Sequence, residues 1–493
     1  MSETGTGTDR AVSPPALARA GLFAGPAVFA VLFLAAPPAG LSEAGWSAVA
    51  VIALMAVWWF SQAIPLAATA LLPALLFPVL GIGSLTEATV PYAHPLIFLF
   101  LGGFVIALTV ERWNLHRRLA IAVIALAGSG PARLTGGFML ATAGLSMWVS
   151  NTATTLMMVP IALSVISFVD TADGAPDRRI AVHRFGCGLL IAIAYAASIG
   201  GLATLIGTPP NAFLAGYMNQ TYGTEIGFGQ WMLLGLPVSA AMLALAWLLL
   251  TRLLFRADDV PLDRVRAGLA EERRRLGPAG RGERMTAVLF GAVALAWMFQ
   301  PLIARAVPIG DTGIALAGAL AAFVLPVSLR GRVFLMDWRD ASRLPWDILL
   351  LFGGGLSLAS AIESTGLASW LGTQFAGADR LPLVAVLLLV TAFVVFLTEL
   401  ASNTATAAVF IPVAATLSAG MGADPLMLAA PVALAASCAF MMPVATPPNA
   451  IVFGAGRLTV LQMCHAGIFL NLIGIAAICI AALYLLPLVF PAG

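Results

Sequence analysis

The chain alternates between long apolar runs and short polar segments. Eleven of the apolar runs approach the roughly 20 residues with which a helix crosses the hydrocarbon core of a bilayer. They cover residues 20–36, 46–60, 63–82, 95–113, 185–218, 228–255, 285–304, 308–330, 346–368, 425–456 and 464–490. The pattern therefore predicts an all-α polytopic membrane protein with about 11 transmembrane helices.

Two further apolar runs, 131–168 and 382–418, are each interrupted midway by Ser-Asn-Thr-Ala-Thr. The pentapeptide occurs at Ser150–Thr154 and again at Ser402–Thr406. Non-helical backbone at membrane depth is tolerated only where protein or a water-filled cavity covers it. Each run is therefore predicted to form a re-entrant helical hairpin, in which two half-helices meet at a tip inside the membrane.

The two halves of the chain repeat one another in order. Each copy of Ser-Asn-Thr is followed by Thr-Pro-Pro-Asn-Ala, at Thr208–Ala212 and at Thr446–Ala450. The number of spans between the copies places the halves in opposite orientation, so the repeat is predicted to be inverted. Inverted repeats with broken helices at matching positions are typical of secondary transporters, whose binding site lies near the bilayer midplane.

Composition narrows the possible functions. Of the 493 residues, 60% are hydrophobic and 10% are charged, which excludes a soluble protein of this length. A net charge of +2 and four scattered histidines indicate neither a nucleic-acid partner nor a metal hydrolase. The four cysteines lie in apolar segments without CxxC spacing. The motifs HExxH and GxSxG are absent from the sequence, so an intramembrane enzyme is not predicted.

The basic residues predict the orientation of the chain. All 25 are arginines, and with a cytoplasmic N-terminus 23 of them fall inside, leaving only Arg305 and Arg380 outside. We therefore expect a multi-pass protein of a bacterial-type inner (plasma) membrane, with its C-terminus external. The first hairpin then enters from the cytoplasm and the second from the outside.

The polar interruptions can bind two kinds of ion. Carbonyl groups at the C-terminal ends of half-helices suit a hard cation such as Na⁺, whereas N–H groups at N-terminal ends suit an anion. Asn, Ser and Thr add neutral oxygens for a cation and donors for a carboxylate. None of the four interruptions contains an arginine. An anion would therefore be neutralised by helix dipoles and bound cations, and this would couple the binding of the two ions.

These motifs resemble those of the divalent anion/sodium symporter family, the INDY-like sodium-coupled dicarboxylate transporters. The resemblance begins at Trp58-Trp59 and Ala63-Ile64-Pro65, includes both Ser-Asn-Thr and both Thr-Pro-Pro-Asn motifs, and covers nearly the whole chain. It implies that one sodium site involves Ser146, Ser150, Asn151 and Gly207, and that a second involves Thr398, Ala401, Ser402, Asn403 and Ala445. It also implies that substrate is bound by Asn151, Thr152, Thr208, Asn403, Thr404, Thr446 and Pro447.

The resemblance further implies sodium-coupled symport of C4 dicarboxylates such as succinate, malate and fumarate, with two or more Na⁺ as coupling ions and no organic cofactor. A sodium-independent dicarboxylate exchanger and a sodium-coupled transporter of citrate or sulfate remain alternatives, because the same donors serve all of these anions. A passive anion channel is a further alternative, which saturable uptake against a gradient would exclude.

Family members form homodimers and work by an elevator movement of a transport domain against a scaffold. For this chain the resemblance implies a cytoplasmic tail (1–18), a scaffold (19–128 and 285–381), a transport domain (129–255 and 382–493) and a cytoplasmic linker (256–284).

Glu399, beside the second Ser-Asn-Thr, has Met147 as its counterpart in the first half. The carboxylate is therefore not part of the duplicated pattern. Two roles remain open for it, namely anchoring of the hairpin and tuning of cation affinity.

Overall fold

The computed structural model describes residues 16–128, 130–169, 176–257, 271, 273–374 and 381–491. The predicted tail therefore lies largely outside the described residues, as does much of the linker. The described chain is mainly helical and carries one antiparallel pair of short strands, β1 (Pro326–Ser328) and β2 (Val333–Phe334). The all-α fold class predicted from the apolar runs is confirmed apart from this small hairpin.

The first half begins with α1 (Ala16–Leu34), α2 (Glu43–Ser61), α3 (Leu66–Thr69), α4 (Leu72–Val79), α5 (Leu85–Thr89), η1 (Val90–Ala93), α6 (Pro95–Arg112) and α7 (Leu115–Leu126). It continues with α8 (Pro131–Ser146), α9 (Asn151–Val169), α10 (Pro176–Gly201), α11 (Pro209–Tyr222), α12 (Phe228–Leu248) and η2 (Leu249–Leu254).

The second half begins with α14 (Arg281–Met298), α15 (Gln300–Ile303), α16 (Asp311–Val324), the two strands, α17 (Trp338–Ala341), α18 (Trp346–Ser364) and α19 (Leu367–Gln374). It ends with α20 (Leu383–Thr398), α21 (Asn403–Gly420), α22 (Leu426–Ala435), α23 (Pro447–Gly454), α24 (Val460–Ile480), η4 (Ala481–Leu485) and α25 (Leu486–Val489).

Within the described residues, nine helices are long and apolar enough to cross a membrane. Seven lie on predicted spans: Ala16–Leu34, Glu43–Ser61, Leu85–Arg112, Arg179–Gly201, Phe228–Leu254, Trp346–Ser364 and Val460–Val489. Of these, Arg179–Gly201 covers only the first part of run 185–218, and α11 covers its last part. The other two, Asn151–Val169 and Asn403–Gly420, are the second arms of the predicted hairpins.

Four predicted spans fall on shorter or interrupted helices. Run 63–82 forms α3 and α4, run 308–330 forms α16 and then β1, and run 425–456 is divided between α22 and α23. Run 285–304 overlaps α14, whose first turn carries Arg281, Glu283 and Arg284, and α15. Prolines interrupt several of these runs because they remove a helical hydrogen bond. For these four runs the count of eleven spans remains a prediction.

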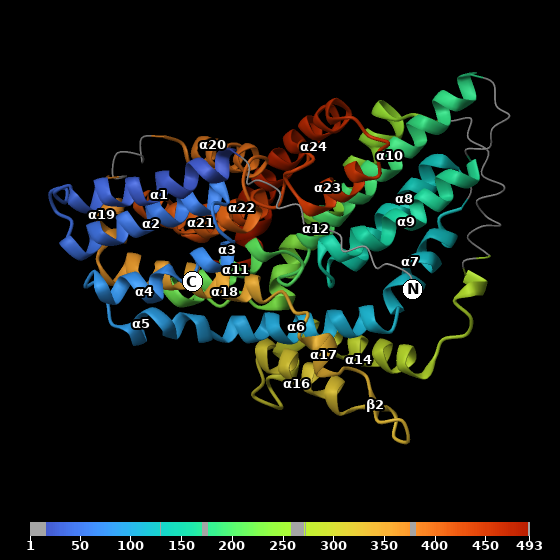
Figure 1. Cartoon of the computed structure of the whole chain (residues 1–493), viewed down its shortest axis with the longest axis horizontal. Coiled ribbons are helices and arrows are strands. Elements are labelled where there is room, and N and C mark those ends of the chain that lie inside the picture. The colour runs from blue at the N-terminus through green and yellow to red at the C-terminus, as the bar shows by residue number, and fades with distance from the viewer. Residues whose placement is uncertain are drawn as a thin grey trace, which may run out of the picture.

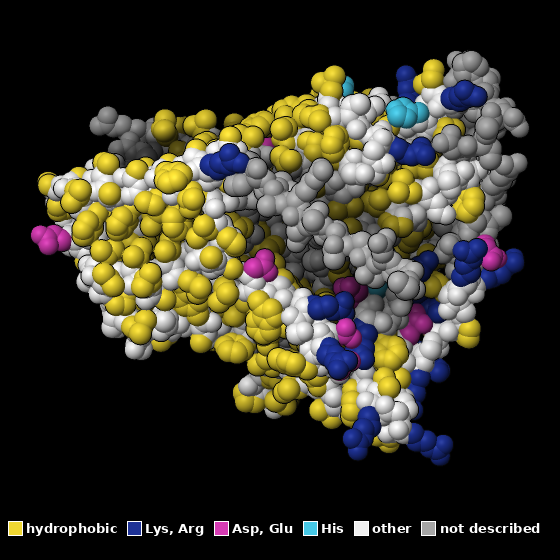
Figure 2. Space-filling view, viewed as in Figure 1, with side chains coloured by type: hydrophobic (Ala, Val, Ile, Leu, Met, Phe, Trp, Pro, Cys, Tyr) yellow, Lys and Arg dark blue, Asp and Glu magenta, His cyan; other side chains and the backbone are white. Residues whose placement is uncertain are grey.

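Most buried hydrophobic side chains form one large cluster that includes residues of both halves. The helix α6 contacts α14, α16, α17 and α18, and the strand pair lies beyond α16 (Figure 1). The helix α10 is buried from Phe185 to Gly201 and contacts α8, α9, α12 and α23. Hydrophobic side chains cover the end of the molecule formed by α1 and α2, whereas arginines gather on the side that carries α14, α17 and the strands (Figure 2).

Candidate functional site

Both predicted hairpins end in short tips. The first tip (Met147–Ser150) joins α8 to α9, and the second tip (Glu399–Ser402) joins α20 to α21. Both Thr-Pro-Pro segments also follow a break in a helix. The first break (202–208) separates α10 from α11, and the second break (436–446) separates α22 from α23.

The two tips and the two breaks line one cavity of about 920 Å³, together with residues of α6 and α18. Of the residues predicted for sodium or substrate, the lining includes Ser150, Asn151, Thr152, Gly207, Thr208, Ser402, Asn403, Thr404, Ala445, Thr446 and Pro447. The other three, Ser146, Thr398 and Ala401, are buried. The structure thus brings together segments that are up to about 300 positions apart in the sequence.

Four helices begin at this cavity. Asn151 starts α9, Asn403 starts α21, Pro209 starts α11 and Pro447 starts α23, and all four residues line the cavity. The first N–H groups of a helix have no partner within the helix and carry partial positive charge. At α9 and α21 these N–H groups belong to Asn151, Thr152, Asn403 and Thr404, which line the cavity and can bind an anion without a basic side chain. The helices α11 and α23 begin with two prolines, which have no N–H, so these two ends contribute their dipole alone.

Behind the first tip, three oxygen atoms lie close together. The Ser146 hydroxyl lies 2.5 Å from the Oδ1 of Asn151 and 2.7 Å from the carbonyl oxygen of Ala197, so both oxygens compete for one proton. Neutral hydroxyl, amide and carbonyl oxygens are ligands that a hard cation accepts. We call these three atoms the first oxygen cluster.

The second half repeats this arrangement. The Thr398 hydroxyl lies 2.8 Å from the Oδ1 of Asn403 and 2.9 Å from the carbonyl oxygen of Ala436. This second oxygen cluster has Thr in place of Ser, and its carbonyl belongs to the second break, whereas the carbonyl of Ala197 belongs to α10. The carbonyl groups of Ala197 and Ala436 were not predicted from the sequence, because a backbone group on an apolar residue leaves no signal there.

The asparagines of the two Thr-Pro-Pro-Asn motifs hold the breaks in shape. The Nδ2 of Asn211 lies 2.8–3.2 Å from the carbonyl oxygens of Gly201, Leu202 and Thr204. The Nδ2 of Asn449 donates in the same way to the carbonyl groups of two residues of the second break, at 3.0 and 3.2 Å. Both asparagines are fully buried. Their structural role was not predicted, although the motif that contains them was.

The two tips are anchored to their breaks by different groups. In the first half the Thr204 hydroxyl donates to the carbonyl of Met147 at 2.5 Å and accepts from the N–H of Gly207 at 3.0 Å. In the second half, the tip is anchored to the break by the carboxylate of Glu399, a residue that is 4% exposed. Of the two roles left open for Glu399, these contacts favour anchoring of the hairpin.

The Glu399 carboxylate accepts four hydrogen bonds. The N–H groups of Phe440 and Met441 and the Nδ2 of Asn471 donate to Oε1 at 2.7, 2.9 and 2.8 Å. The N–H of Met442 donates to Oε2 at 3.0 Å. A buried carboxylate is stable only with such partners, and this one fixes the middle of the second break relative to the second tip.

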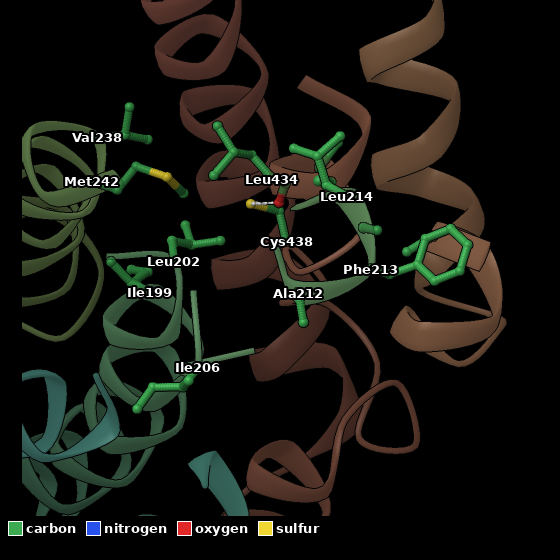
Figure 3. Packing of buried hydrophobic residues seen from close by; sticks show 14 of the residues in the cluster. Ile199, Leu202, Ile206, Ala212, Phe213, Leu214, Val238, Met242, Leu434 and Cys438 are labelled. Atoms are coloured by element: carbon green, nitrogen blue, oxygen red, sulfur yellow. Dashed lines mark hydrogen bonds between the residues drawn. The ribbon is translucent and has the colours of Figure 1, made fainter. Parts of the chain in front are cut away.

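The two halves also contact each other at the breaks. The hydroxyls of Thr208 and Ser437 lie 3.1 Å apart, and both residues are buried. Apolar side chains of the first break pack here against α12 and the second break, around Leu202, Met242 and Cys438 (Figure 3). The Thr446 hydroxyl accepts from the N–H of Asn449 at 3.3 Å and so caps α23.

Two glycines allow the first break to pass close to the first tip. A β-carbon on Gly207 would lie 2.8 Å from the Cα of Gly201, and a β-carbon on Gly201 would lie 2.9 Å from the carbonyl oxygen of Gly207 and 3.0 Å from the Oδ1 of Asn151. Neither methyl group fits without movement of the backbone. Glycine at these positions therefore maintains the geometry of the first oxygen cluster.

We expect Gly207→Ala to destabilise the protein by about 1–3 kcal/mol, because the added methyl group forces the first break away from α10. The midpoint of thermal unfolding of the purified protein measures the effect. Gly144→Ala in α8 is the matched control, because a β-carbon there meets no atom within 4 Å. An unchanged midpoint for Gly207→Ala would contradict the close approach of Gly201 and Gly207.

A family model described as the sodium:sulfate symporter transmembrane region matches residues 18–490. Over 476 residues the chain is 39% identical to the sodium-dependent dicarboxylate transporter SdcS of Staphylococcus saprophyticus, covering 95% of this chain and 91% of the relative. The SdcS protein of Staphylococcus aureus strain bovine RF122 is 40% identical over 474 residues, with the same coverage of both chains.

A solved structure has a similar fold. The crystal structure of the Alcanivorax borkumensis YdaH transporter covers 95% of this chain and 96% of its own, with a TM-score of 0.56. The two sequences are only 14% identical, so this likeness extends to the fold alone.

Proposed function

The chain belongs to the sodium:sulfate symporter family, and from this premise we propose that it takes up C4 dicarboxylates such as succinate, malate and fumarate together with sodium. The relatives named above are sodium-dependent dicarboxylate transporters, and the present chain matches them over 95% of its length. The observation that carries the proposal is the single cavity at which four helices begin and behind which two neutral oxygen clusters lie.

The charge of the site explains why the two ions bind together. Neither tip and neither break contains a basic residue. A dicarboxylate leaving water would therefore depend on helix N-termini and on bound cations for neutralisation. A desolvated ion that lacks its counter-ion is costly, so each ion raises the affinity for the other.

The oxygen clusters support one sodium site each. The first would use Ser146, Ser150 and Asn151 with the backbone of Gly207, and the carbonyl of Ala197 is well placed to join them. The second would use Thr398, Ala401, Ser402, Asn403 and Ala445, joined by the carbonyl of Ala436. All of these ligands are neutral, so a bound Na⁺ keeps its charge available to the substrate.

The substrate carboxylates would lie between the tips. Asn151 and Thr152 would bind one carboxylate and Asn403 and Thr404 the other, because these residues begin α9 and α21 and line the same cavity. Thr208, Thr446 and Pro447 would complete the site from the breaks. Thr208 already has Ser437 as a partner, so it would contribute mainly by shaping the first break.

We assign residues 129–255 and 382–493 to a transport domain that moves against a scaffold of residues 19–128 and 285–381. Stacked aromatic rings support a boundary at this place. Phe228 of α12 lies 4.5 Å from Trp297 of α14 and 5.8 Å from Trp148 of the first tip, measured between ring centroids. The N–H of Phe228 also donates to the Oδ2 of Asp311 in α16 at 2.7 Å. Flat rings can exchange neighbours as one domain slides past another.

A second cavity of about 750 Å³ is lined in part by Phe228 and Trp297 of this aromatic stack. Its lining includes His94, Asn219, Glu225 and Asp311. With the N-terminus cytoplasmic and the C-terminus external, as the arginines favour, the main cavity opens toward the cytoplasm and the second cavity toward the outside. The family resemblance adds the proposal that two copies of the chain form a homodimer.

Sodium dependence tests the proposal most directly. We expect labelled succinate to enter proteoliposomes under an inward sodium gradient, and replacement of sodium by choline to slow its uptake by at least about tenfold. Uptake that proceeds unchanged in choline would contradict the symport proposal. If uptake required only a dicarboxylate inside the vesicle, the exchanger would be favoured instead. Competition by citrate and sulfate at several sodium concentrations would determine the anion preference.

A further inference from the structure

Three ionisable residues lie among the described residues that line the main cavity. Glu111 comes from the end of α6, Asp347 from the first turn of α18, and Arg343 from the segment between α17 and α18. We call these three residues the mouth. Among them Arg343 is the single cation, and its side chain is 56% exposed.

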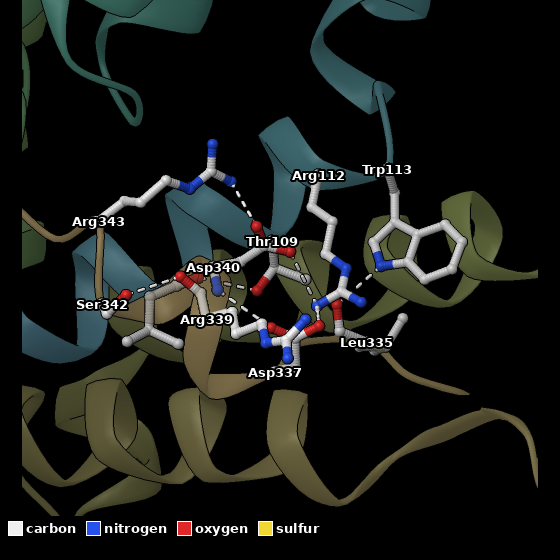
Figure 4. Close-up of polar contacts among 10 residues, drawn as sticks. Thr109, Arg112, Trp113, Leu335, Asp337, Arg339, Asp340, Ser342 and Arg343 are labelled. Atoms are coloured by element: carbon white, nitrogen blue, oxygen red, sulfur yellow. Dashed lines mark hydrogen bonds and ion pairs between the residues drawn. The ribbon is translucent and has the colours of Figure 1, made fainter. Parts of the chain in front are cut away.

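Arg343 is held in place by a group of ion pairs on the scaffold (Figure 4). The Nη2 of Arg343 donates to the Oδ1 of Asp340 at 2.7 Å. The other oxygen of Asp340 lies 3.1 Å from the Nη1 of Arg112, which is 2.7 Å from the Oδ2 of Asp337. Asp337 also caps α17 through the N–H of Asp340. Asp340 is held by Arg112 through one oxygen, so its other oxygen has a fixed position from which it orients the guanidinium of Arg343.

The Asp337 carboxyl of this group stays ionised at neutral pH. The backbone N–H of Asp340 lowers the pKa of the Asp337 carboxyl below its usual range, and the charge of Arg112 lowers it further. A guanidinium carries five N–H donors in a fixed planar arrangement that matches a carboxylate. A bond from Nη2 to Asp340 is therefore compatible with a second carboxylate at the same guanidinium.

We propose that Arg343 binds a carboxylate group of the substrate at the mouth, before the substrate reaches the two tips. This inference rests on the proposed function and deepens it. Without Arg343 the mouth would carry only the two carboxylates of Glu111 and Asp347, which attract sodium and repel a dianion. With Arg343 present, both ions are drawn to the same opening.

Arg343 belongs to neither tip, and the proposed domain assignment places it on the scaffold. The tips bind the anion through neutral groups, so sodium remains the necessary counter-charge there. An arginine within the tips would replace sodium and weaken coupling, whereas an arginine at the mouth does not. Because Arg343 belongs to the proposed scaffold, it stays behind when the tips move, and it acts only on the face to which this cavity opens.

The test compares the two faces of the membrane. The half-saturating succinate concentration is measured for each face of the protein, in vesicles that hold it in one orientation or the other. We expect Arg343→Gln to raise this concentration about 5–10-fold on the face where the main cavity opens. The value on the other face and the thermal unfolding midpoint should stay near those of the unmodified protein. The difference should shrink as ionic strength rises, because salt screens an exposed charge. Arg343→Lys keeps the positive charge, so its half-saturating succinate concentration should stay close to that of the unmodified protein.

Arg339→Gln is the matched control, because Arg339 belongs to α17 but is not among the described residues that line the cavity. It should leave both half-saturating concentrations unchanged. An unchanged value for Arg343→Gln on both faces would overturn the inference, and so would an equal rise on both faces. Absence of sodium-driven uptake in the unmodified protein would instead contradict the proposed function.

Discussion

Asn403→Ala is expected to reduce sodium-driven succinate uptake by about 100-fold or more, and Asn151→Ala is expected to do the same. Each side chain supplies an oxygen to one cluster, where Thr398 or Ser146 lies within 2.8 Å of it. Each residue also begins a helix at the cavity. One substitution therefore removes a proposed sodium ligand and a donor to the substrate at the same time.

Initial rates in proteoliposomes measure this effect, with the unfolding midpoint of the purified protein as a check on folding. Ser167→Ala is the control, since this residue belongs to α9 but bonds only to its own helix in the contacts seen here, through the carbonyl of Ser164. Uptake within a few-fold of the unmodified protein in either variant would refute the role assigned to that tip. Loss in one variant only would mean that the two halves do not contribute equally.

Glu399→Ala is expected to have the largest effect on stability, a loss on the order of 3–5 kcal/mol. The substitution leaves three backbone N–H groups and the amide of Asn471 without their acceptor in a buried place. Glu399→Gln keeps one acceptor oxygen and should lose about half as much. The midpoint of thermal unfolding in detergent measures both variants.

Met147→Ala at the matching position of the first half is the control, because the tip there is anchored through the Thr204 hydroxyl and not through the side chain of Met147. The same experiment separates the two roles considered for Glu399. If Glu399→Gln lowers the unfolding midpoint while the half-saturating sodium concentration stays the same, the residue is an anchor. If the midpoint is unchanged and the sodium dependence shifts, the residue tunes cation affinity and the anchoring role is wrong.

The regular features of the chain could be predicted well from the sequence. The hairpins are one example, because polar interruptions at Ser150 and Ser402 sit in the middle of apolar runs and leave few other structures possible in lipid. The breaks before Pro209 and Pro447 are another, because proline cannot continue the ladder of helical hydrogen bonds. Spans such as 63–82 and 308–330 were less predictable, since an apolar run does not reveal where a helix ends within it.

Individual partners within the site could not be predicted. The carbonyl groups of Ala197 and Ala436 face the tips because of how α10 and the second break pack, and alanine gives no indication of this. The anchoring of the second break by Glu399 depends on three consecutive N–H groups that become available only when the helix is interrupted. The role proposed for Arg343 could not be predicted from the sequence either. The chain has 25 arginines, and Arg343 is distinguished only by its place in the lining of the main cavity.

The sequence by itself determined that this is a membrane protein built from two related halves with interruptions at four matching places. It did so because the energetic cost of polar groups in lipid restricts both the length of apolar runs and the positions at which they can be interrupted. Only the tertiary structure decided that the four interruptions meet in one cavity, which oxygens gather behind each tip, and which charged side chain stands at the mouth. These relations join residues far apart in the chain, and packing fixes them without any local pattern that the sequence could display.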